Sequence, residues 1–146
     1  MPVRMELSRI LIRELNDYQI IELREMSEDS APPGNGEARS FPIVIGLPEA
    51  QAIERRLKGV TIKRPQTHDL LQNVIRELDG ELESISITDL NEHTFFATLD
   101  VRKGGELLHI DARPSDAIAL GIAGDVPIYV AEHVLDSALS EDGPEL

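Results

Sequence analysis

Polar side chains that could do chemistry gather where an apolar stretch of the chain begins. Asp111, Arg113, Ser115 and Asp116 lie just before and at the start of a predicted helix over residues 115–124. The first backbone N–H groups of a helix have no partner within it, and the helix dipole adds partial positive charge there. The sequence therefore predicts a polar site that can bind an anion at this helix start.

A similar arrangement occurs earlier in the chain. Residues 64–69 read RPQTHD and residues 113–116 read RPSD, so both place Arg-Pro, a hydroxyl and a first-turn aspartate before an apolar helix. Hydroxyl caps and first-turn acids are common, so shared helix-start chemistry explains the likeness. The alternative is a duplicated strand–helix unit.

Each of these polar residues also has a purely structural interpretation. A first-turn acid such as Asp69 or Asp116 stabilises its helix by about 0.3 to 1 kcal/mol through the dipole. Arg64 and Arg113 would then be ion-pair partners of those acids, and His68 would be held by a hydrogen bond near the helix cap. The remaining histidines have no spacing typical of metal ligands, and no role is assigned to them: His93, His109 and His133.

The composition limits the class of protein. The chain has 146 residues, enough for one domain, and with 41% hydrophobic but only 3% aromatic residues its core must be aliphatic. It has no cysteine, which excludes disulfides and thiolate sites. Because there is no apolar run near about 20 residues and no signal segment, we expect a cytoplasmic protein without a membrane partner.

The net charge of −13 argues against a simple nucleic-acid-binding role. Acidic residues outnumber basic ones 27 to 14, whereas a protein that neutralises phosphates normally has a basic face. Two routes stay open: a local basic cluster, such as the one within residues 55–64, or a divalent cation that reverses the local charge. The low aromatic content also disfavours the stacking surfaces typical of single-strand binders.

Apolar periodicity predicts the elements that position these residues. The predicted strands cover residues 3–15, 18–26, 41–47, three segments within 81–111, and 126–130. Predicted helices start at Pro48, with Glu49 in the first turn, at the cap Thr67, at Pro114 and at Ala131. A tight two-residue turn at Asn16-Asp17 makes the first two strands a hairpin, and the three later strands form an antiparallel meander.

These elements predict one α+β domain over residues 1–139. An antiparallel hairpin and meander form a partly barrel-like sheet, with about four helices around an aliphatic core. The helix over residues 115–124 has almost no polar face and must be buried. Residues 27–40 are predicted to be a flexible loop within the domain, and residues 140–146 a disordered acidic tail.

Four ordered motifs give the chain a family resemblance. They are EAQAI at residues 49–53 after Ile45-Gly46, RPQTHDLL at 64–71, RPSDAIAL at 113–120 and PIYV at 127–130. In their order and separation they resemble the bifunctional nuclease family, formerly a domain of unknown function, over about residues 3 to 139. Pro48 departs from the bulkier residue expected there. The resemblance implies an α+β homo-oligomer that cleaves DNA and RNA.

The resemblance also implies a site for phosphodiester hydrolysis. Without cysteine, carboxylates that hold Mg²⁺ or Mn²⁺ would supply the charge, an imidazole could transfer the proton, and arginines could clamp the phosphate. A non-enzymatic homo-oligomeric binding or regulatory module is the alternative. The candidates are His68, Asp69, Asp116 and Glu49 for catalysis, Arg64, Arg113 and Ser115 for substrate binding, and Asp69 and Asp116 for the metal.

Overall fold

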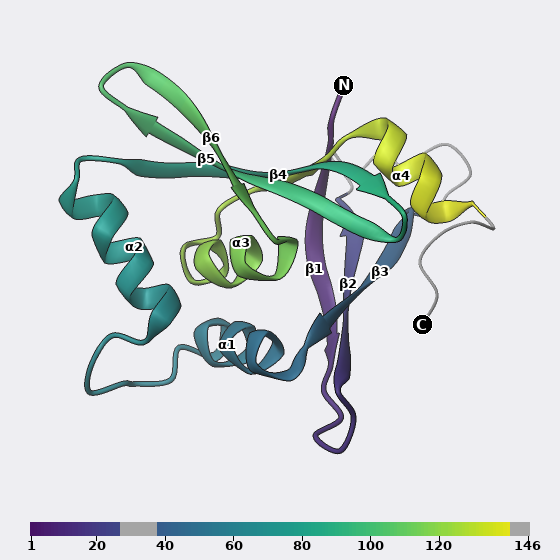
Figure 1. Ribbon diagram of the computed structural model, residues 1–146, viewed down its shortest axis with the longest axis horizontal. Helices are drawn as coiled ribbons and strands as arrows, with labels where there is room; N and C mark the ends of the chain where they lie inside the picture. Colours follow the sequence, from purple (N-terminus) through teal and green to yellow (C-terminus); the bar gives the residue numbers. More distant parts are fainter. Residues whose placement is uncertain (27–37, 141–146) are drawn as a thin grey trace.

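The computed structural model describes residues 1–26 and 38–140. These residues form a seven-stranded mixed sheet and four α-helices, which confirms the α+β fold (Figure 1). Most of the predicted loop at 27–40 and nearly all of the predicted tail lie outside the described residues. Within the described part, no helix has the length and apolar character needed to cross a membrane.

The N-terminal half of the sheet is an antiparallel three-stranded unit. It consists of β1 (Val3–Leu11), β2 (Tyr18–Glu25) and β3 (Ser40–Gly46). The hairpin is confirmed, but the two-residue turn is wrong, because residues 12–17 connect the strands. The buried side chain of Gln19 closes this longer loop by donating to the carbonyl oxygens of Arg13 at 2.9 Å and Asn16 at 2.8 Å.

The predicted meander is confirmed in β4 (Glu81–Asn91), β5 (Thr94–Lys103) and β6 (Glu106–Ala112). Both turns have two central residues with positive φ, the backbone that matches the twist of tight hairpins. Gly104-Gly105 adopts it without steric cost, whereas Glu92 and His93, with φ of 50° and 65°, are held there by the β4–β5 hairpin. His93 therefore projects from a defined turn.

A short strand joins the two halves of the sheet. β7 (Ile128–Val130) pairs antiparallel with β1 and parallel with β4, which gives the order β3-β2-β1-β7-β4-β5-β6. The sheet is open, with β3 and β6 at its edges. In Figure 1 the strands β1 to β3 run across the direction of the meander, so helices can fill the angle between the halves.

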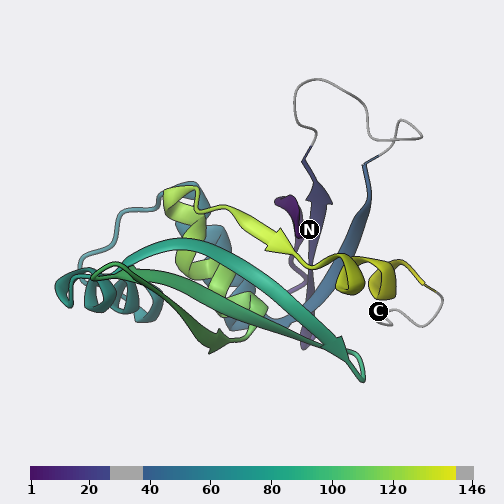
Figure 2. The ribbon, with the colours of Figure 1, turned by 90° about the horizontal axis from the view of Figure 1, so that it is seen from above.

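Helix α3 (Pro114–Gly121) occupies that angle and is buried as predicted. Every residue in it except Asp116 is buried, and it packs against α1 (Leu47–Lys58) and against the curved meander (Figure 2). A Cβ on Gly121 would lie 2.7 Å from a methyl carbon of Ile85, so a larger residue would require its neighbours to shift. A 3₁₀ turn, Ile122–Gly124, ends the helix.

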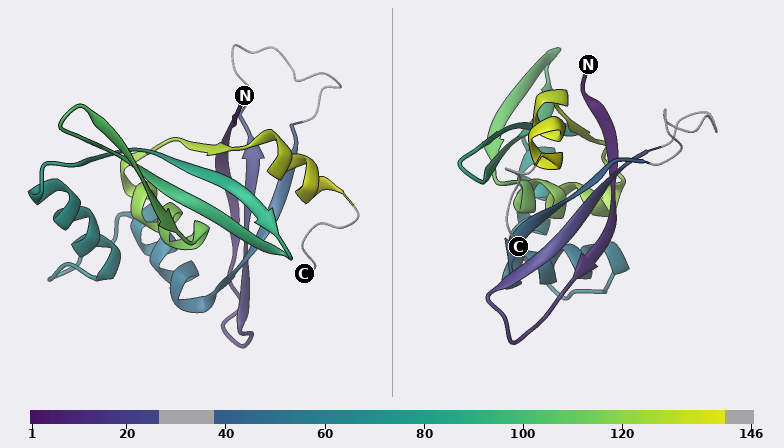
Figure 3. Two further views of the ribbon diagram at one scale, coloured as in Figure 1. Left: turned by 45° about the horizontal axis from the view of Figure 1, so that its top comes forward. Right: turned by 90° about the vertical axis from the view of Figure 1, so that its right-hand side faces the viewer.

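Two other helices lie at the ends of the molecule. α4 (Glu132–Leu139) packs against β4 and β3 (Figure 3). α2 (Thr67–Glu77) forms as predicted, but its N-cap is Gln66, because Asp69 and Gln66 cap each other's backbone and leave Thr67 inside the helix. None of its residues is buried, although its sequence has the most regular apolar stripe in the chain.

The outer face of the meander holds a buried carboxylate that the sequence analysis did not single out. Asp100 on β5 is 2% exposed and accepts hydrogen bonds of 2.6 to 2.8 Å from Ser84, Ser86, Thr98 and His109. Burial alone raises the pKa of Asp100, but these four donors outweigh it and hold the pKa below its ordinary value of 3.8.

The lowered pKa of Asp100 makes acid stability testable. A carboxyl group with a depressed pKa in the folded state stabilises the fold above its ordinary pKa, and this contribution disappears as the pH falls through the folded pKa. An Asp100→Asn variant should therefore lose more unfolding free energy at about pH 6 than at about pH 3, which is below the ordinary pKa. Urea unfolding at both pH values measures this; an equal deficit at each would contradict the assignment.

Candidate functional site

The two polar helix starts meet in the structure. The His68 Nε2 atom, at the start of α2, lies 3.0 Å from Oδ1 of Asp116, at the start of α3, although the residues are 48 positions apart. Nε of Arg113 donates to the other carboxylate oxygen at 2.8 Å. Asp116 therefore links an imidazole and a guanidinium from separate segments.

A third segment reaches the same arginine. Glu49, in the first turn of α1, has its carboxylate 3.6 Å from Nη2 of Arg113. The Glu49 side chain folds back over Gly46, which occupies the N-cap, and a Cβ on that glycine would overlap the carboxylate. The absence of a side chain at Gly46 thus lets Glu49 face Arg113.

Hydrogen bonding fixes the charge of this cluster. Burial alone raises the pKa of Asp116, but the hydrogen bonds from Arg113 and His68 outweigh it and hold the pKa below the ordinary range. The Asp116 carboxylate raises the pKa of Arg113, and the Glu49 carboxylate raises it further by a smaller effect. Asp116 is therefore ionised and Arg113 cationic at any pH near neutrality.

Asp69 belongs to a different network. Its carboxylate forms ion pairs with Arg55, at 3.2 Å, and with Arg56, and it accepts a hydrogen bond from the backbone N–H of Gln66. Burial alone raises its pKa, but the Gln66 bond and the two arginines lower it overall. Arg56 also donates to the carbonyl oxygens of Ala119 and Leu120. Asp69 thus ties α2 to α1 and to the end of α3.

The remaining predicted residues lie in different surroundings. Arg64 is exposed and has no hydrogen bond or ion pair within residues 1–26 and 38–140. Ser115, on α3, is buried, yet it reaches the wall of a pocket. The structure thus brings together His68, Asp116, Arg113 and Glu49, places Ser115 beside them, and leaves Asp69 and Arg64 outside this contact network.

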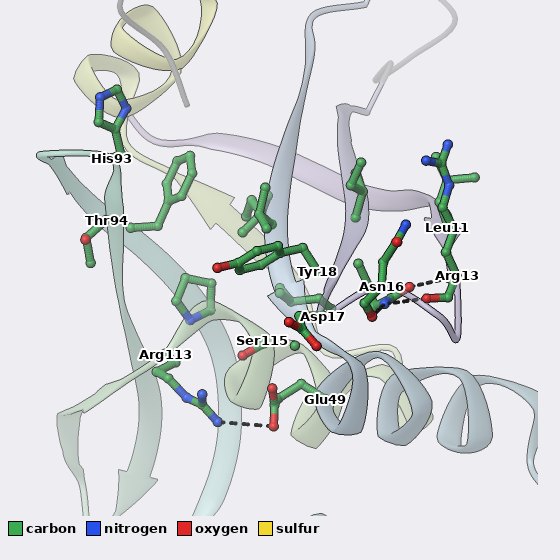
Figure 4. Close-up of a pocket in the computed structure, with 18 residues that line it drawn as sticks. Leu11, Arg13, Asn16, Asp17, Tyr18, Glu49, His93, Thr94, Arg113 and Ser115 are labelled. Carbon is green, nitrogen blue, oxygen red and sulfur yellow. Dashed lines mark hydrogen bonds and ion pairs between the residues drawn. The ribbon is translucent and has the colours of Figure 1, made fainter. Parts of the chain in front are cut away.

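An open pocket of about 810 Å³ lies next to the cluster (Figure 4). It is bounded by the β1–β2 loop, the β3–α1 junction, the β4–β5 turn and the start of α3. Its polar wall includes Arg13, Asp17, Tyr18, Glu49, His93, Arg113 and Ser115. The sequence analysis missed Asp17, Tyr18 and His93, because only the crossing of the two sheet halves brings these loop residues to the α3 start.

The expected Mg²⁺ or Mn²⁺ does not fit the donors present. Both oxygens of Asp69 face arginines, and Asp116 and Glu49 are separated by the Arg113 guanidinium. Across the part of the chain that the structure describes, no three His, Asp or Glu side chains are grouped so that they could hold a metal ion. Hard divalent cations require several converging oxygen ligands.

Comparisons with known proteins identify a family and related sequences. The family model described as the bifunctional nuclease domain matches residues 34–142. An uncharacterised protein of Mycobacterium tuberculosis is 37% identical over 129 residues, covering 88% of this chain and 71% of the relative.

Plant relatives are more distant. Bifunctional nuclease 1 of Arabidopsis thaliana is 24% identical over 103 residues, which is 68% of this chain but 32% of the plant protein. Bifunctional nuclease 1 of Oryza sativa subsp. japonica is 23% identical over 129 residues, covering 82% of this chain and 38% of the relative. The family match extends over most of the chain and includes every segment of the cluster. The chain belongs to the bifunctional nuclease domain family.

Proposed function

We propose that this chain hydrolyses phosphodiester bonds of DNA and RNA at the pocket beside Arg113. The observation that supports this most is the convergence of a guanidinium and a carboxylate, Arg113 and Glu49, on one open pocket, with Asp116 and His68 behind them. Phosphoryl transfer needs charge stabilisation on the non-bridging oxygens and a group that accepts a proton from water.

Arg113 supplies the positive charge that stabilises the non-bridging phosphoryl oxygens. Its Nε is held by Asp116 and its Nη2 faces Glu49, while Nη1 has no protein partner among the described residues. The side chain is 64% exposed, so a phosphate can approach the free edge of the guanidinium. Asp116 and His68 do not line the pocket, and we assign them the role of positioning Arg113.

Glu49 is the proton acceptor in this proposal. Its carboxylate lines the pocket, where it can take a proton from a water molecule that attacks phosphorus. The attack forms a P–O bond to the water oxygen, breaks the bond to the leaving oxygen, and leaves that oxygen to take up a proton from solvent. Ser115, on the same wall, can donate a hydrogen bond to the phosphate.

The test is cleavage of single-stranded DNA and RNA by highly purified protein, with Mg²⁺, with Mn²⁺ and with a chelator. Wild type should cleave both substrates, and Glu49→Gln, which keeps shape but cannot accept the proton, should lose roughly 100-fold or more in rate. Equal rates in wild type and variant would assign the activity to a contaminant or another site. Binding without cleavage would favour the non-enzymatic module.

Gly46→Ala should impair the site without unfolding the chain. The backbone of Gly46, with φ of −80° and ψ of 161°, suits any residue, but the new methyl group would displace the Glu49 carboxylate. A shift of about 1 Å in a reacting group typically lowers rates by roughly 10- to 100-fold. Initial cleavage rates and melting temperatures measure this; the control is Gly124→Ala, where the new Cβ would make only an ordinary contact with Val126.

We also propose that the chain self-associates through the apolar face of α2. Leu70, Leu71, Val74 and Leu78 are between 39% and 63% exposed, and large exposed apolar patches mark interaction sites. A second copy that presents the same face would cover them. Light scattering should show an oligomer that Leu70→Glu dissociates; a monomeric wild type would contradict this.

A further inference from the structure

Tyr18 is an exposed aromatic residue that lines the pocket beside apolar side chains. Its residue exposure is 72%, although it lines the pocket together with Ile20, Ile45 and Phe95. Phe95 is nearly buried and stacks on Phe41 with ring centroids 5.5 Å apart, so the floor beneath is firm. Of the two benzene rings that line the pocket, those of Tyr18 and Phe95, only the Tyr18 ring is largely exposed.

The sheet register places this ring close to the proposed chemistry. Tyr18 is the first residue of β2 and pairs with Gly46, the residue that precedes α1 and accommodates Glu49. In Figure 4 the ring projects across the pocket above Asp17 and Ser115, with its hydroxyl pointing toward the side where Arg113 and Thr94 lie. A flat ligand on the ring would have its polar end near Arg113.

The size and charge of the pocket restrict what that ligand is. A volume of about 810 Å³ suits a small organic group, since ligand pockets span roughly 300 to 1,000 Å³. The pocket wall has two cationic side chains, Arg13 and Arg113, and two carboxylates, Asp17 and Glu49. Because the chain also has a net charge of −13, the pocket disfavours a ligand with many anionic groups. An aromatic group joined to one or few phosphates meets both conditions.

We propose that this pocket binds one unpaired nucleotide of a single-stranded nucleic acid, with its base stacked on Tyr18 and its phosphate at Arg113. This inference rests on the proposed function, for which it names the substrate class. In a duplex the base faces are already stacked, so presenting one to Tyr18 requires flipping the nucleotide out. A duplex also brings a second row of phosphates toward an acidic surface.

The test is the binding of a fluorescent, phosphorothioate-linked oligothymidylate, measured by anisotropy, against a duplex of the same length. Wild type should bind the single strand at least about tenfold more tightly than the duplex, because flipping costs a few kcal/mol. Tyr18→Ala should weaken single-strand binding by roughly 5- to 150-fold, the value of one base–aromatic stack. Tyr18→Phe, which keeps the aromatic ring, should bind the single strand like wild type.

A second aromatic residue provides the matched control. Phe96 is 41% exposed on the opposite face of β5 from Phe95, so Phe96→Ala should bind the single strand like wild type.

Removing the Arg113 side chain should reduce the slope of log affinity against log salt concentration by roughly 0.7, the value for one phosphate contact on a single strand. Circular dichroism confirms that each variant is folded.

The outcomes separate this inference from the proposed function. Equal affinity for duplex and single strand, no single-strand binding by wild type, or an unchanged Tyr18→Ala variant would overturn it, even if the chain cleaves nucleic acid. Selective, Tyr18-dependent binding of the oligothymidylate would support it, even if an unmodified strand is never cleaved.

Discussion

An Arg113→Ala variant is expected to cleave single-stranded DNA and RNA roughly 100- to 1,000-fold more slowly than wild type. The reason is that the variant lacks the preorganised positive charge that stabilises the non-bridging phosphoryl oxygens in the transition state. The Arg113 side chain is 64% exposed, and its ion pairs among the described residues are with Glu49 and Asp116, so the fold should be retained. Initial rates, with melting temperatures as the folding check, measure this.

Arg113→Lys separates charge from geometry. Lysine keeps the positive charge but lacks the planar guanidinium group, which can bond Asp116 along one edge and a phosphate along another. We therefore expect a cleavage rate between those of wild type and Arg113→Ala. An Arg113→Ala variant that cleaves at the wild-type rate would remove Arg113 from the active site, and with it the proposed location of the reaction.

An Asp69→Ala variant is expected to lose about 3 kcal/mol of unfolding free energy, which lowers the melting temperature by roughly 6 to 12 °C. Removing this carboxylate leaves Arg55 and Arg56 unpaired, and the Arg56 side chain is only 8% exposed. Removing one partner of a buried ion pair is costly, because the remaining charge stays desolvated. Urea and thermal unfolding measure the loss.

The control for Asp69 is an exposed ion pair on α1, the helix that carries Arg55 and Arg56. Glu54 lies 3.6 Å from Lys58 one turn away, and both side chains are largely exposed, so Glu54→Ala should cost at most about 0.5 kcal/mol. If Asp69→Ala is no more destabilising than Glu54→Ala, the network that joins α1, α2 and α3 contributes little to stability.

Local patterns predicted most of the fold. Alternating apolar residues predicted the hairpin and the meander, and the uniformly apolar segment after Arg113 predicted that α3 is buried. The predicted β1–β2 turn was wrong because the side chain of Gln19, at the start of β2, closes a connection of six residues, where Asn16-Asp17 alone suggested a tight turn. Periodicity cannot show such a side-chain closure.

The site was harder to predict than the fold. Helix-start chemistry pointed to Asp69 and Asp116 alike, because both occupy the same place in their helices. Only tertiary packing distinguishes them, since Arg56 reaches Asp69 from α1 whereas Asp116 faces His68 and Arg113. Asp100, Tyr18 and His93 belong to no motif, and their surroundings depend on strand register.

In the proposed site, Asp116 contributes to cleavage only by positioning Arg113. A double-mutant cycle with Asp116→Asn and Arg113→Ala, read as initial rates on single-stranded RNA, tests this most directly. Asp116→Asn alone should slow cleavage by roughly 10-fold or more, because the guanidinium is no longer held, and the double variant should be no slower than Arg113→Ala. If the two losses multiply, or if Asp116→Asn cleaves at the wild-type rate, the arrangement described here does not carry the reaction.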